Sequence, residues 1–487
     1  MAQAGIGKIC GESGVIPSLT EAIRTLVGAE HMLTGLAAAP YCKDQRGNYS
    51  GMALAVVFPA DTQQVSSLVS LCAAHRTAIV PQGGNTSLCG ASVPLAEVEP
   101  AVFDQQVVIN LSRMTGIRSF DAANYSMTVE AGCTLAHVRE IAAQNNRLFP
   151  LSLTAIDSRC EIGGNLSTNA GGIGVLRYGN MRDLVLGLEV VLPDGRIWNG
   201  LRSLRKDNSG YDLKHLFIGA EGTLGIITAA VLKLFPRPVS QATACVAVRE
   251  PATAVALLAH LRATCGDRIS AFEIIGRPCL DIVLRHFSDT QEPFKQVHQW
   301  MVVTELSDVL EVSLEAALRN ALDSFSEGGL SEYLVTDNKA QAAPWWNLRK
   351  YISDAQKMDG ISIKHDISVP ISNVPAFIEL ADAALNRAFP GVRIVAFGHI
   401  GDGNIHYNAS MPDPVQNGQF FARSAEVNRI VYDTVAQLNG SISAEHGLGQ
   451  LKRDEIRHYK NALELELMRN IKHTLDPQGL MNPGKLI

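Results

Sequence analysis

Strand and helix patterns alternate from about residue 52 to residue 235, and this alternation most constrains how the chain can fold. Asp61 and Thr134 each precede a segment with apolar residues at helical spacing, which predicts two N-capped helices. Ser18 and Glu21 form the pattern of a capping box before an earlier helix. Short apolar runs predict strands at residues 54–58, 78–80, 107–111, 127–129, 224–227 and 230–235. Such alternation is typical of an α+β or α/β domain.

The rest of the chain divides into two further parts. Pro236-Arg237-Pro238 follows the last of these strands and predicts a domain boundary. Residues 240–400 then show a second alternation of helix and strand patterns. A final helix pattern, stopped by Asp476-Pro477, has four apolar residues on one face, namely Leu463, Leu467, Ile471 and Leu475. We therefore expect three units, residues 1–238, 239–450 and 451–487.

The composition and charge restrict the possible classes of function. With 487 residues, 46% of them hydrophobic, the chain has enough apolar material for two or three packed domains. The formal net charge of −6, without a run of basic residues, argues against a nucleic-acid-binding surface. Nine cysteines without a Cys-x-x-Cys pair favour reduced thiols over a disulfide framework. There is no signal-like N-terminus and no apolar run of about 20 residues. We expect a soluble, cytoplasmic protein that does not span a membrane.

Two glycine-rich clusters lie within the first alternation, at residues 81–88 and 163–172. Consecutive glycines allow backbone N–H groups to turn toward an anion, and the neighbouring Asn and Thr side chains add hydrogen-bond donors. Neither cluster has the G-x-G-x-x-G dinucleotide pattern, and no P-loop Gly-Lys-Ser/Thr follows. One cluster alone is more often a turn. Two clusters in one domain, followed by residues 208–212 and 219–225, favour a pyrophosphate site.

Residues 396–408 and 443–449 contain three histidines, a glutamate and an asparagine in glycine-flanked segments. His399 and His406 are separated by seven positions around a Gly-Asp-Gly-Asn sequence, which predicts two adjoining strands with a tight turn between them. Two imidazoles and a carboxylate are suitable ligands for a divalent metal. Either segment alone could be only a turn, whereas the pair predicts a metal site.

These motifs together resemble the flavin-binding domain of the vanillyl-alcohol-oxidase superfamily. The resemblance covers the chain from about residue 50 to its end and is carried in the first domain by residues 81–86, 163–172, 177–179, 187–195 and 219–226. The metal-like segments, with residues 482–486, resemble its FAD-linked D-2-hydroxy acid dehydrogenase branch. Residues 203–214 and 441–447 most resemble the D-2-hydroxyglutarate dehydrogenases of that branch. The resemblance implies an α+β fold: a two-subdomain FAD-binding domain, an α+β substrate (cap) domain and a C-terminal helical segment.

The resemblance also implies where FAD binds. The pyrophosphate would lie against the first glycine turn, and the second glycine segment and one strand residue would complete the site. The matching residues are Pro81, Gly83, Gly84, Asn85, Thr86, Gly90, Ser92, Gly163, Gly164, Thr168, Asn169, Gly172 and Ile226. Several members of the superfamily tether FAD through a histidine in the first segment. Asn85 follows the glycine pair here, so we expect FAD to be bound without a covalent bond.

Metal and substrate positions are implied in the same way. His399, His406 and Glu445 match metal ligands, with zinc preferred over manganese or cobalt. His446 matches the catalytic base and, with Asn408, a substrate contact. Three residues match contacts to the substrate anion, namely Arg349, Ser353 and Lys364. Where the family commonly has threonine this chain has Ser353, which keeps the hydroxyl.

The chemistry of the residues agrees with these roles. Oxidation of a 2-hydroxy acid removes a hydroxyl proton and moves a hydride from C2 to the flavin N5. A metal on the hydroxyl lowers its pKa, and His446 is suited to accept the proton because imidazole titrates near neutral pH. Arg349 and Lys364 can neutralise carboxylates. A second cation is useful chiefly for a diacid, which favours D-2-hydroxyglutarate as substrate and 2-oxoglutarate as product.

Other functions fit parts of the sequence. The same type of enzyme could act on D-lactate, D-malate or another D-2-hydroxy acid. An oxygen-using flavin oxidase is disfavoured by the missing tethering histidine, and a non-catalytic flavin subunit would not need the metal-like cluster. No NAD fingerprint is present. The family suggests electron-transfer flavoprotein or a quinone-linked carrier as electron acceptor. The oligomeric state is left open, a homodimer being possible.

Overall fold

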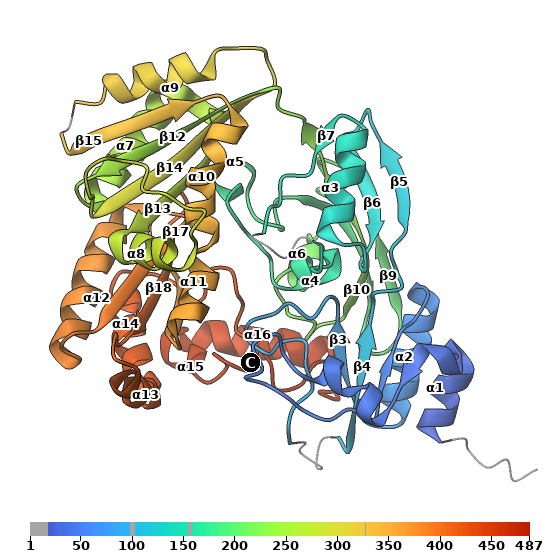
Figure 1. Ribbon diagram of the computed structural model, residues 1–487. Coiled ribbons are helices and arrows are strands. Elements are labelled where there is room, and N and C mark those ends of the chain that lie inside the picture. Colours follow the sequence, from blue (N-terminus) through green and yellow to red (C-terminus); the bar gives the residue numbers. More distant parts are fainter. Residues whose placement is uncertain (1–17, 98–102, 154–157, 327) are drawn as a thin grey trace, which may run out of the picture.

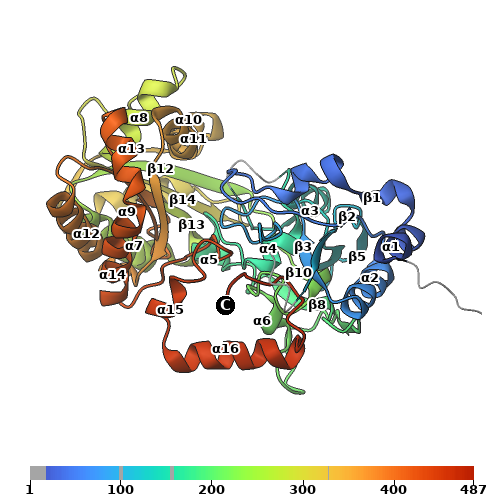
Figure 2. The same ribbon diagram turned by 90° about the horizontal axis from the view of Figure 1, so that it is seen from below.

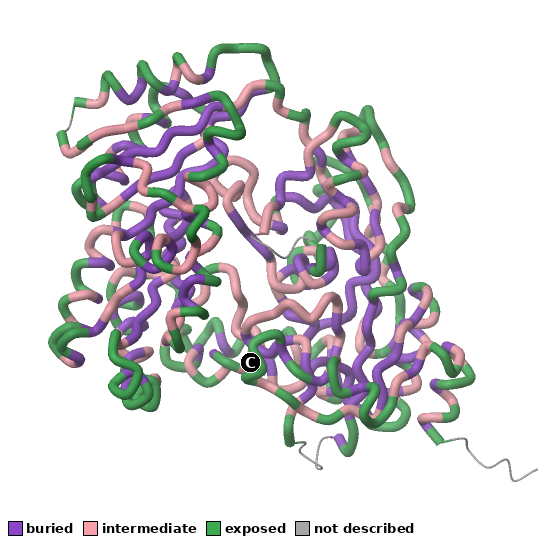
Figure 3. Tube along the Cα trace, in the orientation of Figure 1, coloured by how far each residue is buried: buried purple, intermediate pink, exposed green. Residues whose placement is uncertain are grey.

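The computed structural model describes residues 18–97, 103–153, 158–326 and 328–487, which form two lobes (Figure 1). The N-terminal lobe comprises the described part of residues 18–236, and the cap lobe comprises the described part of residues 240–450. The C-terminus lies between the two lobes in both views (Figures 1 and 2). Buried residues follow the strands of both lobes, so each lobe has its own core (Figure 3).

The first half of the N-terminal lobe is a four-stranded sheet in the order β1-β2-β4-β3, of which β2, β4 and β3 are parallel. Its strands are β1 Met32–Leu33, β2 Ala55–Val57, β3 Thr77–Gln82 and β4 Gln105–Asn110. Helices α1 (Leu19–Val27) and α2 (Thr62–Ala74) pack on it. Both begin where the sequence predicts. Ser18 and Glu21 form the capping box, and Asp61 accepts a hydrogen bond from the N–H of Gln64.

The second half of the lobe is an antiparallel five-stranded sheet in the order β5-β6-β10-β8-β9. These strands are β5 Ile117–Asp121, β6 Ser126–Glu130, β8 Val185–Val191, β9 Ile197–Gly200 and β10 Ile226–Lys233. Its helices are α3 Leu135–Gln144, capped by Thr134 as predicted, α4 Ile162–Ser167, α5 Val175–Tyr178 and α6 Lys214–Phe217. A two-stranded ribbon pairs β7 (Arg147–Leu148) with β11 (Phe235–Pro236).

One predicted pair of strands is wrong. Residues 224–227 and 230–235 do not form two strands, because β10 runs continuously through both. The polar residue between them, Thr228, is fully buried, and its hydroxyl donates a hydrogen bond to the Glu189 carboxylate at 2.9 Å. A register shift between Ile227 and Ala229 accommodates it as a bulge. The hydrogen bond of the Thr228 hydroxyl therefore allows one strand to continue where the sequence predicts a gap between two.

The cap lobe is a seven-stranded, fully antiparallel sheet in the order β15-β12-β14-β13-β17-β18-β16. Its strands are β12 Ser240–Val248, β13 Ile269–Gly276, β14 Trp300–Asp308, β15 Leu330–Thr336, β16 Ile363–Ser368, β17 Arg393–Gly398 and β18 Asn404–Ser410. One face packs against α7 Pro251–Cys265, α9 Leu314–Asp323, α12 Val374–Ala388, α13 Pro414–Ala422 and α14 Ser424–Gln437. The other face packs against α8 Arg277–His286, α10 Lys339–Lys350 and α11 Ile352–Asp359. The mixed α+β fold agrees with the sequence analysis.

The C-terminal segment returns to the N-terminal lobe through α15 (Ile456–Tyr459) and α16 (Ala462–Leu475). The α16 helix ends at Asp476 as predicted, but its apolar face is mostly open to solvent, with Leu463 59% and Leu467 52% exposed. After the helix, Met481 pairs with Ile79 beside β3 and is fully buried. The segment is therefore held by its last residues more than by the apolar face of the helix.

A buried ion pair fixes the end of α16. Asp476 is 3% exposed and accepts hydrogen bonds from the N–H groups of Leu480 and Met481. The Lys472 ammonium lies 2.5 Å from the Asp476 carboxylate and also donates to the carbonyls of Thr223 and Met481, both at 2.7 Å. Lys472 thus connects the C-terminal segment with the N-terminal lobe.

We expect Lys472→Met to lower the urea midpoint of unfolding, because Asp476 stays buried without its cation. Removing one partner of a buried pair costs about 3–5 kcal/mol. Lys460→Met is the matched control, since Lys460 pairs with Glu464 at the same i,i+4 spacing on the surface, where such pairs contribute roughly 0.3–0.5 kcal/mol. Circular dichroism during urea titration measures both variants. Equal midpoints would show that the buried pair does not stabilise the fold.

Candidate functional site

The two glycine clusters of the N-terminal lobe lie against each other. A Cβ atom on Gly83 would lie 3.7 Å from the backbone nitrogen of Gly164, and one on Gly84 would lie 1.8 Å from the carbonyl oxygen of Arg159. At the end of the second cluster, a Cβ atom on Gly172 would lie 2.1 Å from the carbonyl oxygen of Ser152. Only glycine permits such close approach of two backbone segments. A Cβ atom on Gly164, in contrast, would meet nothing within 4 Å. The segments therefore form a narrow cradle, the glycine cradle, defined by residues 81–86 and 159–164, with open space beside Gly164.

Most of the predicted cofactor residues lie in or beside this cradle. Asn85 has a left-handed backbone (φ 51°), donates to the carbonyl of Lys43 and accepts from the Ser92 hydroxyl at 2.7 Å. The remaining members of the first segment are Pro81 on β3, Gly83, Thr86 and Gly90, the last of which packs against Tyr49. The second segment supplies Gly163, Thr168, whose hydroxyl donates to the Gly164 carbonyl at 3.1 Å, and Asn169.

The predicted cofactor residue Ile226 is the first residue of β10. Its side chain is 1% exposed and belongs to an apolar core that it shares with residues of β3, β4 and α2.

The cradle has the properties expected of a site for FAD. Two polar atoms at its second segment, Glu161 Oε2 and Asn165 Nδ2, are buried without a hydrogen-bond partner among the described residues. Buried polar groups without partners are rare in folded proteins and indicate a ligand or water. A glycine-lined gap with orphan polar atoms fits the diphosphate and ribityl chain of FAD.

The second candidate site lies in the cap lobe, at the turn between β17 and β18. His399 follows β17, and His406 lies on β18, so the predicted strand–turn–strand arrangement is confirmed. The two imidazole rings are 5.6 Å apart between centroids. Glu445 lies 3.5 Å from His406 Nε2 and 3.4 Å from His446 Nε2. The structure thus brings His406, Glu445 and His446 into direct contact, and the His399 ring lies beside that of His406.

Glu273 on β13 connects His399 with Arg349 on α10. One carboxylate oxygen accepts from His399 Nδ1 at 2.6 Å, and the other accepts from Arg349 Nε at 2.7 Å. Burial lowers the pKa of His399, but the charge and hydrogen bond of Glu273 outweigh it and raise that pKa to about 9. Because Nδ1 donates to Glu273, Nε2 is the atom of His399 that is left to bind a metal, as in carboxylate–histidine–metal arrangements.

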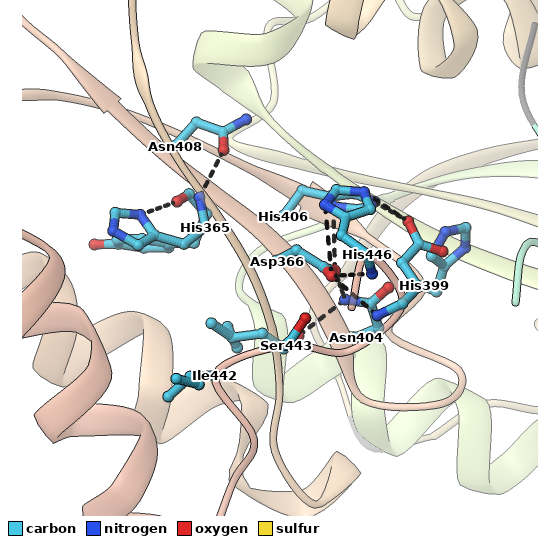
Figure 4. Close-up of polar contacts among 12 residues, drawn as sticks. His365, Asp366, His399, Asn404, His406, Asn408, Ile442, Ser443 and His446 are labelled. Carbon is cyan, nitrogen blue, oxygen red and sulfur yellow. Dashed lines mark hydrogen bonds and ion pairs between the residues drawn. The ribbon is translucent and has the colours of Figure 1, made fainter. Parts of the chain in front are cut away.

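Asp366 on β16 positions the loop that carries Glu445 and His446. Its carboxylate accepts from the N–H groups of both residues at 2.9 Å and from the Asn404 amide at 2.9 Å. These bonds and the neighbouring positive charges lower the pKa of Asp366 although burial opposes them. His446 Nδ1 lies 3.6 Å from the same carboxylate (Figure 4).

The ligand atoms of Asp366, His406, Glu445 and His446 lie within 4.8 Å of one another, which makes them a possible metal cluster. Asp366 already accepts three hydrogen bonds, so it is better suited to support the cluster than to bind the ion. Burial lowers the pKa of His406 to about 4, which keeps its imidazole in the neutral form that a metal requires. The donor set of imidazoles and carboxylates fits a divalent metal.

Two predicted substrate residues lie on the strands that carry Asp366 and His406. Lys364 on β16 pairs in register with Asn408 on β18. Burial, with the charges of Arg46 and Lys357, lowers the pKa of Lys364 to about 8. The Asn408 amide is used within the protein, since it accepts from the N–H of His365 and donates to Gln356. Ser353 is exposed near the start of α11, one turn after Arg349.

Three supporting carboxylates are absent from the residues predicted from the sequence, namely Glu161, Glu273 and Asp366. Glu273 interrupts the apolar strand pattern Ala-Phe-Glu-Ile-Ile, and a charge inside such a pattern could have revealed it. Asp366 lies in the polar stretch Lys-His-Asp, which gives no such signal.

The loop that carries Glu445 and His446 also contacts the N-terminal lobe. The Glu221 carboxylate accepts from the N–H groups of Leu448 and Gly449 at 2.7 and 2.8 Å. The Gln450 amide donates to the carbonyl of Gly90 at 2.8 Å. The metal-like cluster therefore faces the lobe that contains the glycine cradle.

None of the helices in the described ranges combines the length and apolar character needed to cross a bilayer. The eight cysteines within those ranges are buried thiols outside any disulfide.

Comparison with known proteins agrees with an FAD-binding chain. Residues 53–200 match the FAD binding domain family, and residues 237–486 match the family of FAD linked oxidases, C-terminal domain. A D-2-hydroxyglutarate dehydrogenase from Xanthomonas citri pv. viticola is 37% identical, over 92% of each chain. The mitochondrial D-2-hydroxyglutarate dehydrogenase of Arabidopsis thaliana is 36% identical over 91% of this chain and 77% of its own.

The solved structure of p-cresol methylhydroxylase with substrate bound has the same fold. It superposes with a TM-score of 0.73 and 18% identity, over 96% of each chain. The family matches extend over both lobes, and the curated relatives are similar along nine-tenths of the sequence. The chain therefore belongs to the FAD-linked oxidase family and, within it, to the group of the D-2-hydroxyglutarate dehydrogenases.

Proposed function

We propose that this chain oxidises D-2-hydroxyglutarate to 2-oxoglutarate, with FAD in the glycine cradle and a divalent metal at His399, His406 and Glu445. The observation that carries the proposal is the loop of residues 443–450. It holds Glu445 and His446 and is hydrogen-bonded to Gly90 and Glu221 of the N-terminal lobe. A substrate on the metal cluster would therefore lie beside the cofactor.

Each bound group would supply one part of the chemistry. FAD, when bound, supplies flavin N5 as the acceptor of the hydride from C2. The metal, when bound, lowers the pKa of the substrate hydroxyl. The protein supplies the base, His446, whose imidazole would accept the hydroxyl proton. Asp366, 3.6 Å from His446 Nδ1, stabilises the resulting imidazolium and fixes the ring orientation.

The charges of the site favour a diacid, although not in the way that the sequence suggests. Arg349 is not an uncompensated cation, because Glu273 already pairs with its Nε. Lys364 has no ion-pair partner of this kind among the described residues, and the charges of Arg46 and Lys357 oppose its protonation. A substrate carboxylate beside Lys364 would stabilise the protonated, positively charged form of its amine. We assign the distal carboxylate to Lys364, and the C1 carboxylate to Arg349 and the metal.

Further properties follow as proposals from the family. FAD would be held without a covalent bond, because Asn85 and not histidine follows the glycine pair. Zinc is the preferred metal, and electron-transfer flavoprotein or a quinone-linked carrier is the preferred electron acceptor. A cytoplasmic location and a homodimer complete the proposal, while the Arabidopsis relative is named as a mitochondrial protein.

Removal of the metal should abolish turnover and leave the flavin absorption spectrum in place. Glu445→Gln should have the same effect, because a neutral amide is a weaker metal ligand than a carboxylate. Zinc, manganese or cobalt should restore activity to the chelated wild type but not to the variant. Metal analysis and dye-linked turnover measure both. The control is Glu426→Gln, an exposed residue paired with Arg423. Full activity in a preparation verified as metal-free would reject the metal.

His446→Ala should lower kcat by about 10²–10⁴, the usual range for loss of a general base. The contents of FAD and metal should be unchanged, since other residues hold both. Stopped-flow reduction of the flavin by D-2-hydroxyglutarate measures the chemical step, with the exposed His458→Ala as control. If only KM increased, His446 would be a binding residue and another group would be the base.

Lys364→Met should lower kcat/KM for D-2-hydroxyglutarate by roughly tenfold to a hundredfold, because a charged hydrogen bond contributes about 1.5–3 kcal/mol. The same change should affect D-lactate, which lacks the distal carboxylate, far less. Lys350→Met, an exposed lysine on α10, serves as control. Steady-state kinetics with both substrates and with L-2-hydroxyglutarate, expected to be inactive, test the assignment. A wild-type preference for D-lactate would place the chain in the lactate branch.

A further inference from the structure

Glu161 is a buried carboxyl group inside the glycine cradle. It directly precedes α4, is 6% exposed, and its backbone pairs with Thr134. Its side chain lies against the first glycine segment, since a Cβ atom on Gly83 would be 3.1 Å from Glu161 Oε2 and 3.7 Å from the N–H nitrogen of Gly164. The carboxyl group therefore lies where the two glycine segments meet.

The Oε2 atom of Glu161 has no hydrogen-bond partner within the described part of the chain. One helical turn later, Asn165 Nδ2 is buried and equally without a partner. A buried polar atom without a partner costs about 1–3 kcal/mol, and an unpaired buried charge costs more. Two such atoms, one of them against Gly83 where the two glycine segments meet, indicate that a ligand completes their hydrogen bonds.

The ionisation of this group follows from its surroundings. Burial raises the pKa of Glu161 to about 8. The titratable group facing it from the turn before α3 is Cys133, and burial raises the pKa of that thiol to about 11. The first glycine segment presents Gly83 and no charged side chain at this point. The guanidinium of Arg159, two residues earlier, belongs to an exposed residue. A neutral carboxyl group, unlike a carboxylate, carries an O–H donor.

We propose that Glu161 is protonated when the cradle holds FAD, and that its O–H donates a hydrogen bond to an oxygen of the diphosphate–ribityl region. The proposal rests on the proposed binding of FAD in the cradle and adds a cofactor-binding residue that is absent from the predicted set. The negative diphosphate excludes the alternative of an ionised Glu161, because two like charges would then lie side by side in a buried site.

The proposal predicts that FAD binds more weakly at high pH. Binding requires the protonated group, so the dissociation constant should be constant below about pH 8, where Glu161 of the apoprotein already holds its proton. Above that pH the apoprotein ionises, while a bound diphosphate raises the pKa of Glu161 further. The dissociation constant should then increase by up to about tenfold per pH unit.

The test is a titration of the apoprotein with FAD, followed by flavin fluorescence between pH 6.5 and 9.5, without substrate or metal. Glu161→Gln keeps a donor and cannot ionise, so it should bind FAD about as tightly as the wild type at pH 7, with no loss of affinity above pH 8. Glu161→Ala should bind FAD roughly tenfold to a hundredfold more weakly at pH 7. Glu140→Gln, an exposed residue on α3, is the matched control and should follow the wild-type pH profile.

Two outcomes would overturn the assignment. One is a wild-type affinity for FAD that does not change between pH 7 and 9.5. The other is a Glu161→Gln variant, folded by circular dichroism, with the same pH profile as the wild type. Neither outcome concerns the oxidation of D-2-hydroxyglutarate, which is measured separately on the loaded enzyme. A protein with the predicted FAD profile but no turnover would reject the proposed reaction and leave the role of Glu161 intact.

Discussion

The carboxylate of Glu221 joins the parts of the protein on which both candidate sites depend. It is buried and accepts the N–H groups of Leu448 and Gly449 from the cap lobe. Its backbone has a left-handed conformation (φ 50°), donates to the carbonyl of Ser167 at the end of α4, and accepts from the Asn482 amide of the C-terminal segment. A left-handed non-glycine residue costs about 1–3 kcal/mol. Hydrogen bonds to three separate segments offset that cost and fix the cap loop against the cradle.

Buried carboxylates are the common element of the metal-like cluster. Glu273 pairs with His399 and Arg349, and Asp366 accepts three N–H groups. Isolated charges would be expensive to bury, so each is stable only because its partners are in place. The same bonds orient the imidazole of His399 and hold the loop of Glu445 and His446. The site is therefore preorganised by residues that need not touch the substrate.

The glycine cradle, in contrast, is not held by paired buried charges. Its geometry depends on a missing side chain, since a Cβ atom on Gly84 would overlap the carbonyl oxygen of Arg159. Where the cap cluster satisfies its buried groups internally, the cradle leaves Glu161 and Asn165 unsatisfied. This difference separates a preformed cluster of imidazoles and carboxylates from the proposed FAD site, whose hydrogen bonds a large cofactor would complete.

The sequence by itself determined the local elements and identified the FAD-linked oxidase family. Capping boxes, N-caps and apolar periodicity depend on residues three or four positions apart, so α1, α2 and α3 begin where predicted. The turn between His399 and His406 is equally local. Tertiary structure decided which carboxylates serve these residues, because Glu273 and His399 are 126 positions apart and Glu221 and Gly449 are 228 apart. It also left the apolar face of α16 exposed, since burial depends on what packs against a helix and not on its periodicity.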